Sequence, residues 1–178
     1  KDIMKVRTVT LFYIAFFCIF SVFISADTLT SEMQRLQPFV GKWKTRSVYP
    51  DSGLTAPGVL EYRWILGGKW LFIEFIGKHP KRKHWGAYSF IRHDKDRKCY
   101  LCYDRYDETA PILSTGYWIN KQTIRFEDRN AKIHWGIDYT IRRDGSIYQE
   151  NWVMREGKRS ITLKTTYKRL PTKQSGRK

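Results

Sequence analysis

Acidic residues are scarce in this sequence, which has 17 Asp and Glu against 33 Lys and Arg and a formal charge of +16. So large a basic excess predicts attraction to polyanions such as acidic polysaccharide, anionic lipid or nucleic acid. The loop that contains Lys81, Arg82 and Lys83 is the densest basic stretch. The other basic residues are spread over many segments, so we expect weak contact with anionic surfaces. A binder of polyanions or membrane surfaces that uses Lys81, Arg82 and Lys83 is kept as an alternative function.

Cysteine is also rare, and its pattern argues against a disulfide or a metal site. Only Cys99 and Cys102 follow the N-terminal region, within a run of strand-forming residues. Residues three apart on a strand point to opposite faces, with Cα atoms roughly 10 Å apart, which is beyond disulfide reach. A zinc site would need a second pair of ligands at suitable spacing, and the sequence has none. We therefore expect two separate thiols and no metal ligands.

Catalytic motifs are missing as well: there is no Gly-x-Ser-x-Gly elbow, phosphate-binding loop, dinucleotide fingerprint or His-Glu-x-x-His. Of the carboxylates, Glu150 shares a predicted strand face with Tyr148 and Trp152, which makes it the best candidate for an interior acid. Glu61 and Asp138 fall opposite the aromatic faces and are expected to point outward. An isomerase or hydrolase that uses an interior carboxylate is therefore kept as an alternative to a binding protein.

The first 26 residues resemble a secretory signal. Lys5 and Arg7 precede an apolar run from Val9 to Ile24, and Ser25-Ala26 supplies small residues before Asp27. This order predicts export, with cleavage after Ala26 and a secreted or periplasmic mature protein. A membrane anchor is the lesser alternative, because the run approaches the length of a spanning helix. We expect one barrel domain at 27–170 and a disordered basic tail at 171–178.

The rest of the sequence alternates in the manner of β-strands. From Trp43 to Tyr49, aromatic and small residues alternate with basic ones, which is typical of a strand with one face in water. A short helical turn, with Ser31 and Gln34 in capping-box spacing, precedes it and ends at Pro38. Ten strands are predicted. They cover residues 42–49, 58–66, 69–77, 85–92, 98–104, 112–119, 123–128, 132–142, 146–155 and 158–169.

Short turns join these strands, and closure would remove the exposed edges of an aromatic-rich sheet. The sequence therefore predicts an all-β fold, a ten-stranded antiparallel up-and-down barrel with the helical turn capping one end. A ten-stranded barrel has room for a ligand in its lumen. We expect eight residues to line the site, seven of them aromatic. They are Tyr62, Trp64, Tyr88, Phe90, Trp135, Tyr139, Glu150 and Trp152.

Gly41-x-Trp43, together with the hairpin from Glu61 to Leu71, resembles the calycin superfamily of lipocalins, fatty-acid-binding proteins and nitrobindin-like barrels. The block is most similar to a family of small, mostly bacterial calycin-like proteins of uncharacterised function. The resemblance implies a small hydrophobic or amphipathic ligand in the barrel. It also implies that Lys168 or Arg169, late in the last strand, packs on Trp43.

Cofactors and nucleic acid are not expected. Nitrobindin-like barrels bind haem through a histidine in the C-terminal strand region, and residues 161–169 contain no histidine. His134 is the one histidine that could face inward, and nothing else supports haem. Seven tryptophans on a basic chain would suit base stacking. However, Trp64, Trp135 and Trp152 lie on alternating apolar faces, where core packing is the ordinary explanation. The sequence leaves the ligand and the oligomeric state open.

Overall fold

The computed structural model describes residues 29–79, 82–106 and 110–171, apart from the side chains of 78–79 and 82–85. The expected signal segment, Lys81 and the tail from 172 onward lie outside the described residues, as do the side chains of Arg82 and Lys83. Ten strands make up most of the described chain. They are β1 (Gly41–Val48), β2 (Thr55–Ile65), β3 (Trp70–His79), β4 (Arg82–Asp94), β5 (Cys99–Tyr106), β6 (Ile112–Trp118), β7 (Thr123–Asp128), β8 (Trp135–Ile141), β9 (Ile147–Arg155) and β10 (Lys158–Arg169).

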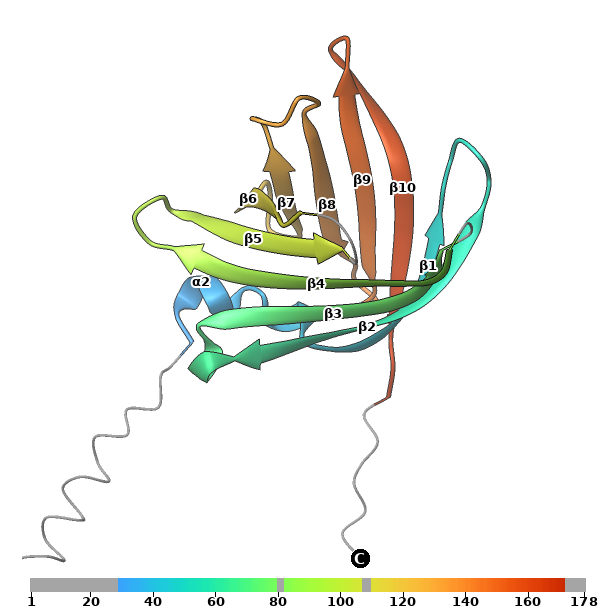
Figure 1. Cartoon of the computed structure of the whole chain (residues 1–178). Coiled ribbons are helices and arrows are strands. Elements are labelled where there is room, and N and C mark those ends of the chain that lie inside the picture. Colours follow the sequence, from blue (N-terminus) through green and yellow to red (C-terminus); the bar gives the residue numbers. More distant parts are fainter. Residues whose placement is uncertain (1–28, 80–81, 107–109, 172–178) are drawn as a thin grey trace, which may run out of the picture.

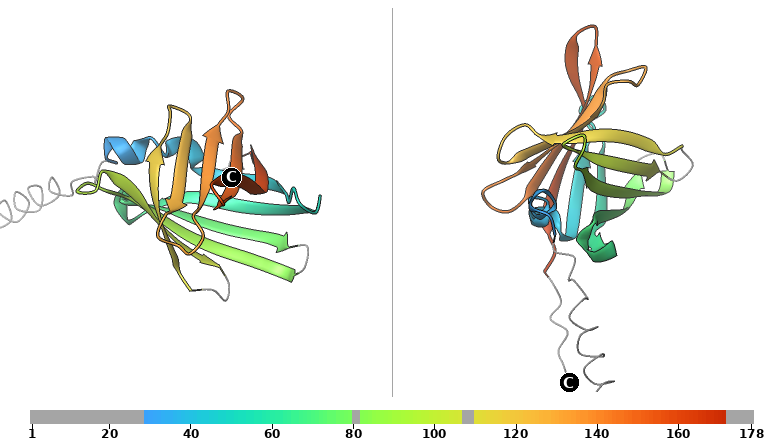
Figure 2. Two further views of the ribbon diagram at one scale, coloured as in Figure 1. Left: turned by 90° about the horizontal axis from the view of Figure 1, so that it is seen from above. Right: turned by 90° about the vertical axis from the view of Figure 1, so that its left-hand side faces the viewer.

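Every strand pairs antiparallel with its neighbour in sequence, and β1 also pairs with β10, so that the sheet closes on itself. This confirms the predicted ten-stranded up-and-down barrel. In Figure 1, β2 to β5 run across the view while β7 to β10 run up it, and Figure 2 shows the same sheet from two further sides. The strong change in strand direction follows from the twist that a closed sheet must accumulate.

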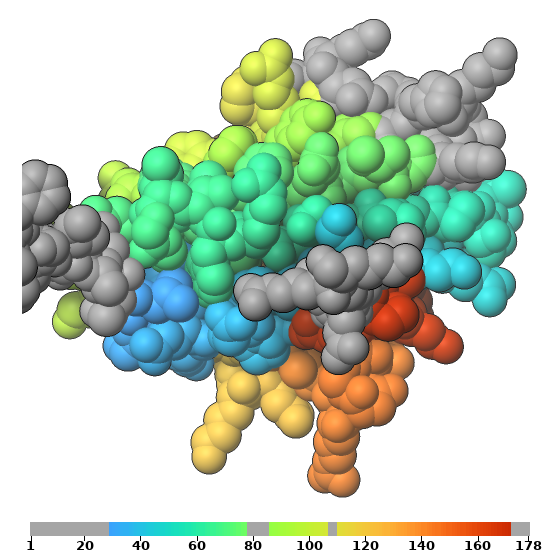
Figure 3. Space-filling view, turned by 90° about the horizontal axis from the view of Figure 1, so that it is seen from below, coloured from blue at the N-terminus to red at the C-terminus, as the bar shows by residue number. Residues whose placement is uncertain are grey.

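A short cap covers one end of the barrel. It consists of α2 (Ser31–Gln34) and the 3₁₀ turn η1 (Gln37–Phe39). Met33, Leu36 and Phe39 are buried in the core, as expected for one apolar face. The N-cap is Thr30, whose hydroxyl accepts a hydrogen bond from the Met33 amide, and not Ser31 as the spacing predicted. Figure 3 shows the cap, in blue, beside the green part of the sheet.

The end of β10 fastens the barrel closure to this cap. The Arg169 guanidinium lies 4.3 Å from the ring of Trp43 and donates hydrogen bonds to the carbonyls of Val40 and Pro38 at 2.6 and 2.7 Å. The Trp43 indole N–H donates to the Phe39 carbonyl at 2.7 Å. Gly41 has φ +133°, and a Cβ there would come within 2.6 Å of the guanidinium. In the Gly-x-Trp pattern, Gly41 therefore leaves room for the Arg169 guanidinium and Trp43 packs against it; we call this arrangement the Trp43 seat.

The thiols agree with the prediction, whereas the connection between β2 and β3 differs from it. Cys99 and Cys102 are both free thiols, Cys102 buried and Cys99 half-buried, as expected. The Gly67-Gly68 connection is longer than the predicted two-residue turn. It forms the 3₁₀ turn η2 (Leu66–Gly68), with positive φ at all three residues. None of the helices in the described ranges is long and apolar enough to cross a bilayer.

Candidate functional site: the barrel lumen

The lumen is divided into a filled half and a hollow half. At the capped end, residues from the cap and from five strands meet and leave a void of only about 10 Å³. These residues are Leu36, Phe39, Tyr62, Leu71, Ile73, Ile91, Ile124, Phe126 and Tyr139. A void of this size holds at most a single water molecule. The capped half is therefore solid core.

The half of the lumen away from the cap contains a cavity of about 100 Å³. Its described lining residues are Thr45, Ser47, Leu60, Tyr62, Ile73, Phe75, Ala87, Ser89, Asp104, Tyr106, Ile137, Tyr139, Gln149, Asn151, Leu163, Thr165 and Tyr167. The lining mixes apolar side chains with hydroxyls, two amides and one carboxyl. Such a mixed lining is typical of a site that orients a small molecule by a few polar contacts.

Asp104 is the carboxyl in this cavity. It lies on the inward face of β5 and is 8% exposed. Its Oδ1 accepts hydrogen bonds from the Ser89 hydroxyl and from the Cys102 thiol, the latter at 3.4 Å. Burial raises the pKa of Asp104 above its ordinary value, against the opposing effect of these two hydrogen bonds. No basic side chain is among the described lining residues, so nothing described there neutralises the carboxylate.

Most other polar groups of the lining pair with one another. The Tyr167 hydroxyl donates to the Gln149 side-chain carbonyl, and the Gln149 amide donates to Asn151. Ser47 and Thr165 share a hydrogen bond of 2.9 Å across the β1–β10 closure. The polar side chains that β9 and β10 direct into the cavity are therefore hydrogen-bonded to one another or to Ser47 of β1.

Thr45, on β1, is a lining residue whose hydroxyl is not paired in this way. It is 2% exposed, and its hydroxyl has no hydrogen-bond partner among the described residues. A buried hydroxyl without a partner costs about 1–3 kcal/mol, so native proteins seldom retain one without a reason. Together, Thr45 and Asp104 are two lining groups whose burial costs stability, the hydroxyl because it has no described partner and the carboxyl because burial opposes its ionisation.

Of the eight residues predicted for the site, Tyr62 and Tyr139 lie on the cavity wall. Trp64 packs at the capped end, where its indole donates to Gln37 at 2.9 Å. Trp135 begins β8, is half-buried, and is not among the described residues of the cavity wall. Whether Tyr62 and Tyr139 bind a ligand stays a prediction.

The faces predicted for β4 were inverted. Tyr88 and Phe90 are 47% and 37% exposed and both contact Phe72 on the outside of the barrel. Ala87 and Ser89 face the cavity instead. Inside the barrel, Ala87 lies between Phe75 and Tyr106 of the neighbouring strands, which already occupy the lumen at this level. The outer face gives the rings of β4 an aromatic neighbour.

The faces predicted for β9 were also inverted. The prediction that Glu150 supplies an interior carboxylate is wrong, since Gln149 and Asn151 take the inward positions. Glu150 lies outside, 3.4 Å from Arg159 and within hydrogen-bond distance of Tyr148. Trp152 is buried on the same outer face.

An ion cluster covers Trp152. Arg125 and Arg159 lie 5.1 and 5.0 Å from the indole ring, and both bond to Asp138, to which the indole N–H also donates at 3.2 Å. Burial alone would raise the pKa of Asp138, but the bonds from Arg125 and Trp152 outweigh it and hold that pKa below its ordinary value. This cluster stabilises the outside of the sheet.

A second outer group accounts for His134. The imidazole lies 3.2 Å from Glu127, which also accepts hydrogen bonds from Tyr117 and Arg129. His134 therefore lies outside the lumen and not on its inner wall. Within the described part of the chain, no group of three His, Cys, Asp or Glu side chains is placed to hold a metal ion.

The sequence reasoning missed Asp104 and Thr45. One signal could have found Asp104. Tyr100, Cys102, Asp104 and Tyr106 share one face of β5, so a carboxylate stands among thiol and aromatic side chains. Nothing in the pattern of β1 distinguishes Thr45 from an ordinary strand threonine.

No family model and no curated protein matches this sequence. Among solved structures, the chain is similar to a redesigned β-barrel, mFAP0, bound to DFHBI, with a TM-score of 0.40 and 13% identity over 75% of this chain and 100% of that one. It is similar to a second redesigned barrel, b11L5F_LGL, with a TM-score of 0.40 and 12% identity over 77% of this chain and 96% of that one.

Proposed function

We propose that this protein is a calycin-like binding protein that holds a small amphipathic molecule in the open half of its barrel. The observation that carries the proposal is the cavity itself, with the unpartnered Thr45 hydroxyl and the Asp104 carboxyl on an otherwise partly apolar wall. A purely apolar ligand would leave the Thr45 hydroxyl without a partner and the buried Asp104 carboxyl with only its bonds from Ser89 and Cys102. A ligand with a hydrogen-bonding group would satisfy them.

The size of the cavity narrows the class of ligand. At about 100 Å³ it is smaller than the roughly 300–1,000 Å³ of sites for drug-sized molecules. The ligand is therefore a small molecule, or one that inserts a single polar end and leaves the rest toward the open end of the barrel. The signal-like residues 1–26 support binding outside the cytoplasm, in a secreted or periplasmic protein.

Native mass spectrometry of the protein purified from its own host tests the proposal. We expect an added mass that organic extraction removes. Ala87→Leu adds three carbons to the cavity wall and should abolish the added mass, whereas Ser160→Leu, on an exposed position of β10, should retain it. Thermal denaturation of both variants checks that they remain folded. Equal retention of the added mass by the two folded variants would place the ligand elsewhere and contradict the proposal.

A further inference from the structure

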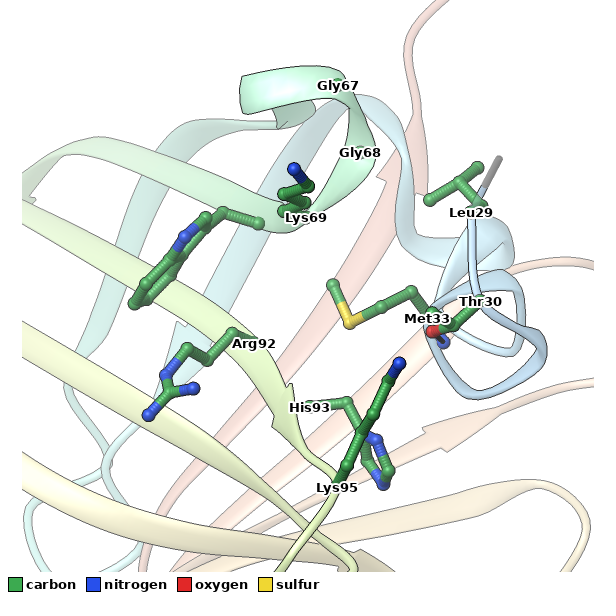
Figure 4. A pocket seen from close by; sticks show the side chains of 10 residues that line it. Leu29, Thr30, Met33, Gly67, Gly68, Lys69, Arg92, His93 and Lys95 are labelled. Atoms are coloured by element: carbon green, nitrogen blue, oxygen red, sulfur yellow. Dashed lines mark hydrogen bonds between the residues drawn. The ribbon is translucent and has the colours of Figure 1, made fainter. Parts of the chain in front are cut away.

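A second and larger pocket lies outside the lumen, beside the cap. It measures about 510 Å³ and is formed where the start of α2, the turn η2 and the end of β4 meet (Figure 4). This volume falls in the range of small-molecule sites, roughly 300–1,000 Å³. The pocket shares none of its described lining residues with the luminal cavity.

One part of this cap-side pocket is apolar. Met33, 2% exposed, presents its side chain from α2, and Leu29 packs against Gly68 of η2. Trp70, at the start of β3, lines the opposite wall and contacts Tyr103 at 5.9 Å between ring centroids. Because Met33 belongs to the barrel core, this apolar surface is held in place by the fold.

The other part is cationic. Its cations are Lys69, Arg92 and Lys95, and none of the ten described lining residues is acidic. Figure 4 shows Lys95 extending toward Met33 and Thr30, with Arg92 on the other side of the pocket. Cations that line a pocket beside an apolar wall would attract an anion that also carries an apolar group.

One acidic residue, Asp94, contacts this cationic group. Asp94 lies 3.7 Å from Arg92, at the long end of an ion pair. Its carboxylate also accepts hydrogen bonds at 3.1 Å from the backbone amides of Asp96 and Arg97, within the turn after β4. The Arg92 guanidinium also lies 5.6 Å from the ring of Trp70, a contact that uses none of its N–H groups as hydrogen-bond donors to oxygen. A guanidinium has five N–H donors, so donors of Arg92 remain for a ligand.

We propose that the cap-side pocket binds an amphipathic organic anion. Its carboxylate, phosphate or sulfate group would lie between Arg92 and Lys95, and its apolar part would lie against Leu29 and Trp70, above the buried Met33. This site is separate from the luminal site and does not depend on it.

The probe for a first test is 1-anilinonaphthalene-8-sulfonate, an amphipathic sulfonate whose fluorescence rises on binding. The double variant Arg92→Gln/Lys95→Gln should weaken its affinity about tenfold or more, because two charge-assisted contacts are lost. The matched control Lys44→Gln/Lys168→Gln removes the same charge from exposed positions of β1 and β10 and should change affinity by less than about twofold. The single variant Lys95→Gln changes only an exposed turn and is expected to fold even if the double variant does not. It should weaken the dye affinity by less than the double variant does.

Competition identifies the ligand chemistry. Octyl phosphate, below its micelle concentration, should displace the dye, whereas inorganic phosphate at the same concentration and ionic strength should not. Equal affinities in the two double variants would overturn the proposal, as would equal displacement by both phosphates. A loss of dye binding in Ala87→Leu alone would assign the dye to the lumen and would also overturn it.

Discussion

Arg169 should contribute more to stability than its exposed position suggests. Its guanidinium joins β10 to the cap through two carbonyls and packs on Trp43, which is 0% exposed. Each of the two hydrogen bonds, at an exposed site, is taken as about 1 kcal/mol, and the cation–π contact adds about 0.5–1 kcal/mol. Arg169→Ala should therefore lower the free energy of unfolding by about 2–3 kcal/mol, a large share of a typical total.

Arg169→Lys separates the two contributions. An ammonium keeps the charge over the indole but lacks the planar fork that reaches both Val40 and Pro38. We expect it to lose about 1 kcal/mol, one of the two hydrogen bonds. Lys168→Ala is the control, since Lys168 is the exposed neighbour on the opposite face of β10.

Urea denaturation, followed by tryptophan fluorescence, measures these differences at constant m-value. Arg169→Ala should also lower Tm by about 4–12 °C, given roughly 2–4 °C per kcal/mol for a chain of this size. The unfolding free energies of Arg169→Ala and Lys168→Ala are expected to differ only if the Arg169 contacts stabilise the fold. If they agree within about 0.5 kcal/mol, the contacts of Arg169 with Trp43, Val40 and Pro38 do not stabilise the protein and the reasoning fails.

Three further predictions concern the lumen, the outer cluster and the thiols. Because burial raises the pKa of Asp104 in the folded state, stability contributed by its protonated form is lost as pH rises above the ordinary carboxyl range. Asp104→Asn should therefore gain stability relative to wild type between pH 4 and 7 in urea titrations, and a constant difference would contradict this. Gly136→Ala places a Cβ 2.4 Å from the Trp152 ring and should cost about 1–3 kcal/mol by calorimetry, the usual penalty of overpacking; an unchanged Tm would show that Trp152 can move away. In native protein, iodoacetamide and peptide mapping should find the half-buried Cys99 modified well before the buried Cys102, since burial raises the pKa of both thiols but only Cys99 is accessible to the reagent, and equal rates would refute that placement.

The architecture was predictable because closure needs only a count of strands and short turns. Ten alternating segments with polar breaks leave few ways to bury their apolar faces, and the antiparallel pairings follow from sequence order. The Trp43 seat was predictable too, since Gly41 and a basic residue late in β10 occur at informative positions. These features depend on the alternation within each strand and on which strands are first and last, both of which can be read from the sequence.

The composition of the lumen was not predictable in the same way. On β4 and β9, the rule that aromatic faces point inward chose Phe90 and Trp152, whereas the barrel places Ser89 and Gln149 inside. Both aromatic rings find cover on the outside, Phe90 from Phe72 and Trp152 from flanking arginines. That cover comes from other strands, so a single strand read alone cannot show it.

Because β4 and β9 direct small or polar side chains inward and not their aromatic ones, the half of the lumen away from the cap is not filled. The capped half shows that this chain can pack its interior to a void of about 10 Å³ with ordinary aliphatic and aromatic residues. In the other half it keeps a buried hydroxyl without a described partner at Thr45 and a carboxyl whose burial opposes ionisation at Asp104. Both features cost stability, and an isosteric valine at position 45 would remove one of them. A barrel under selection for stability alone would lose them, and this is the reason for which we propose a ligand with a polar group in this half of the lumen.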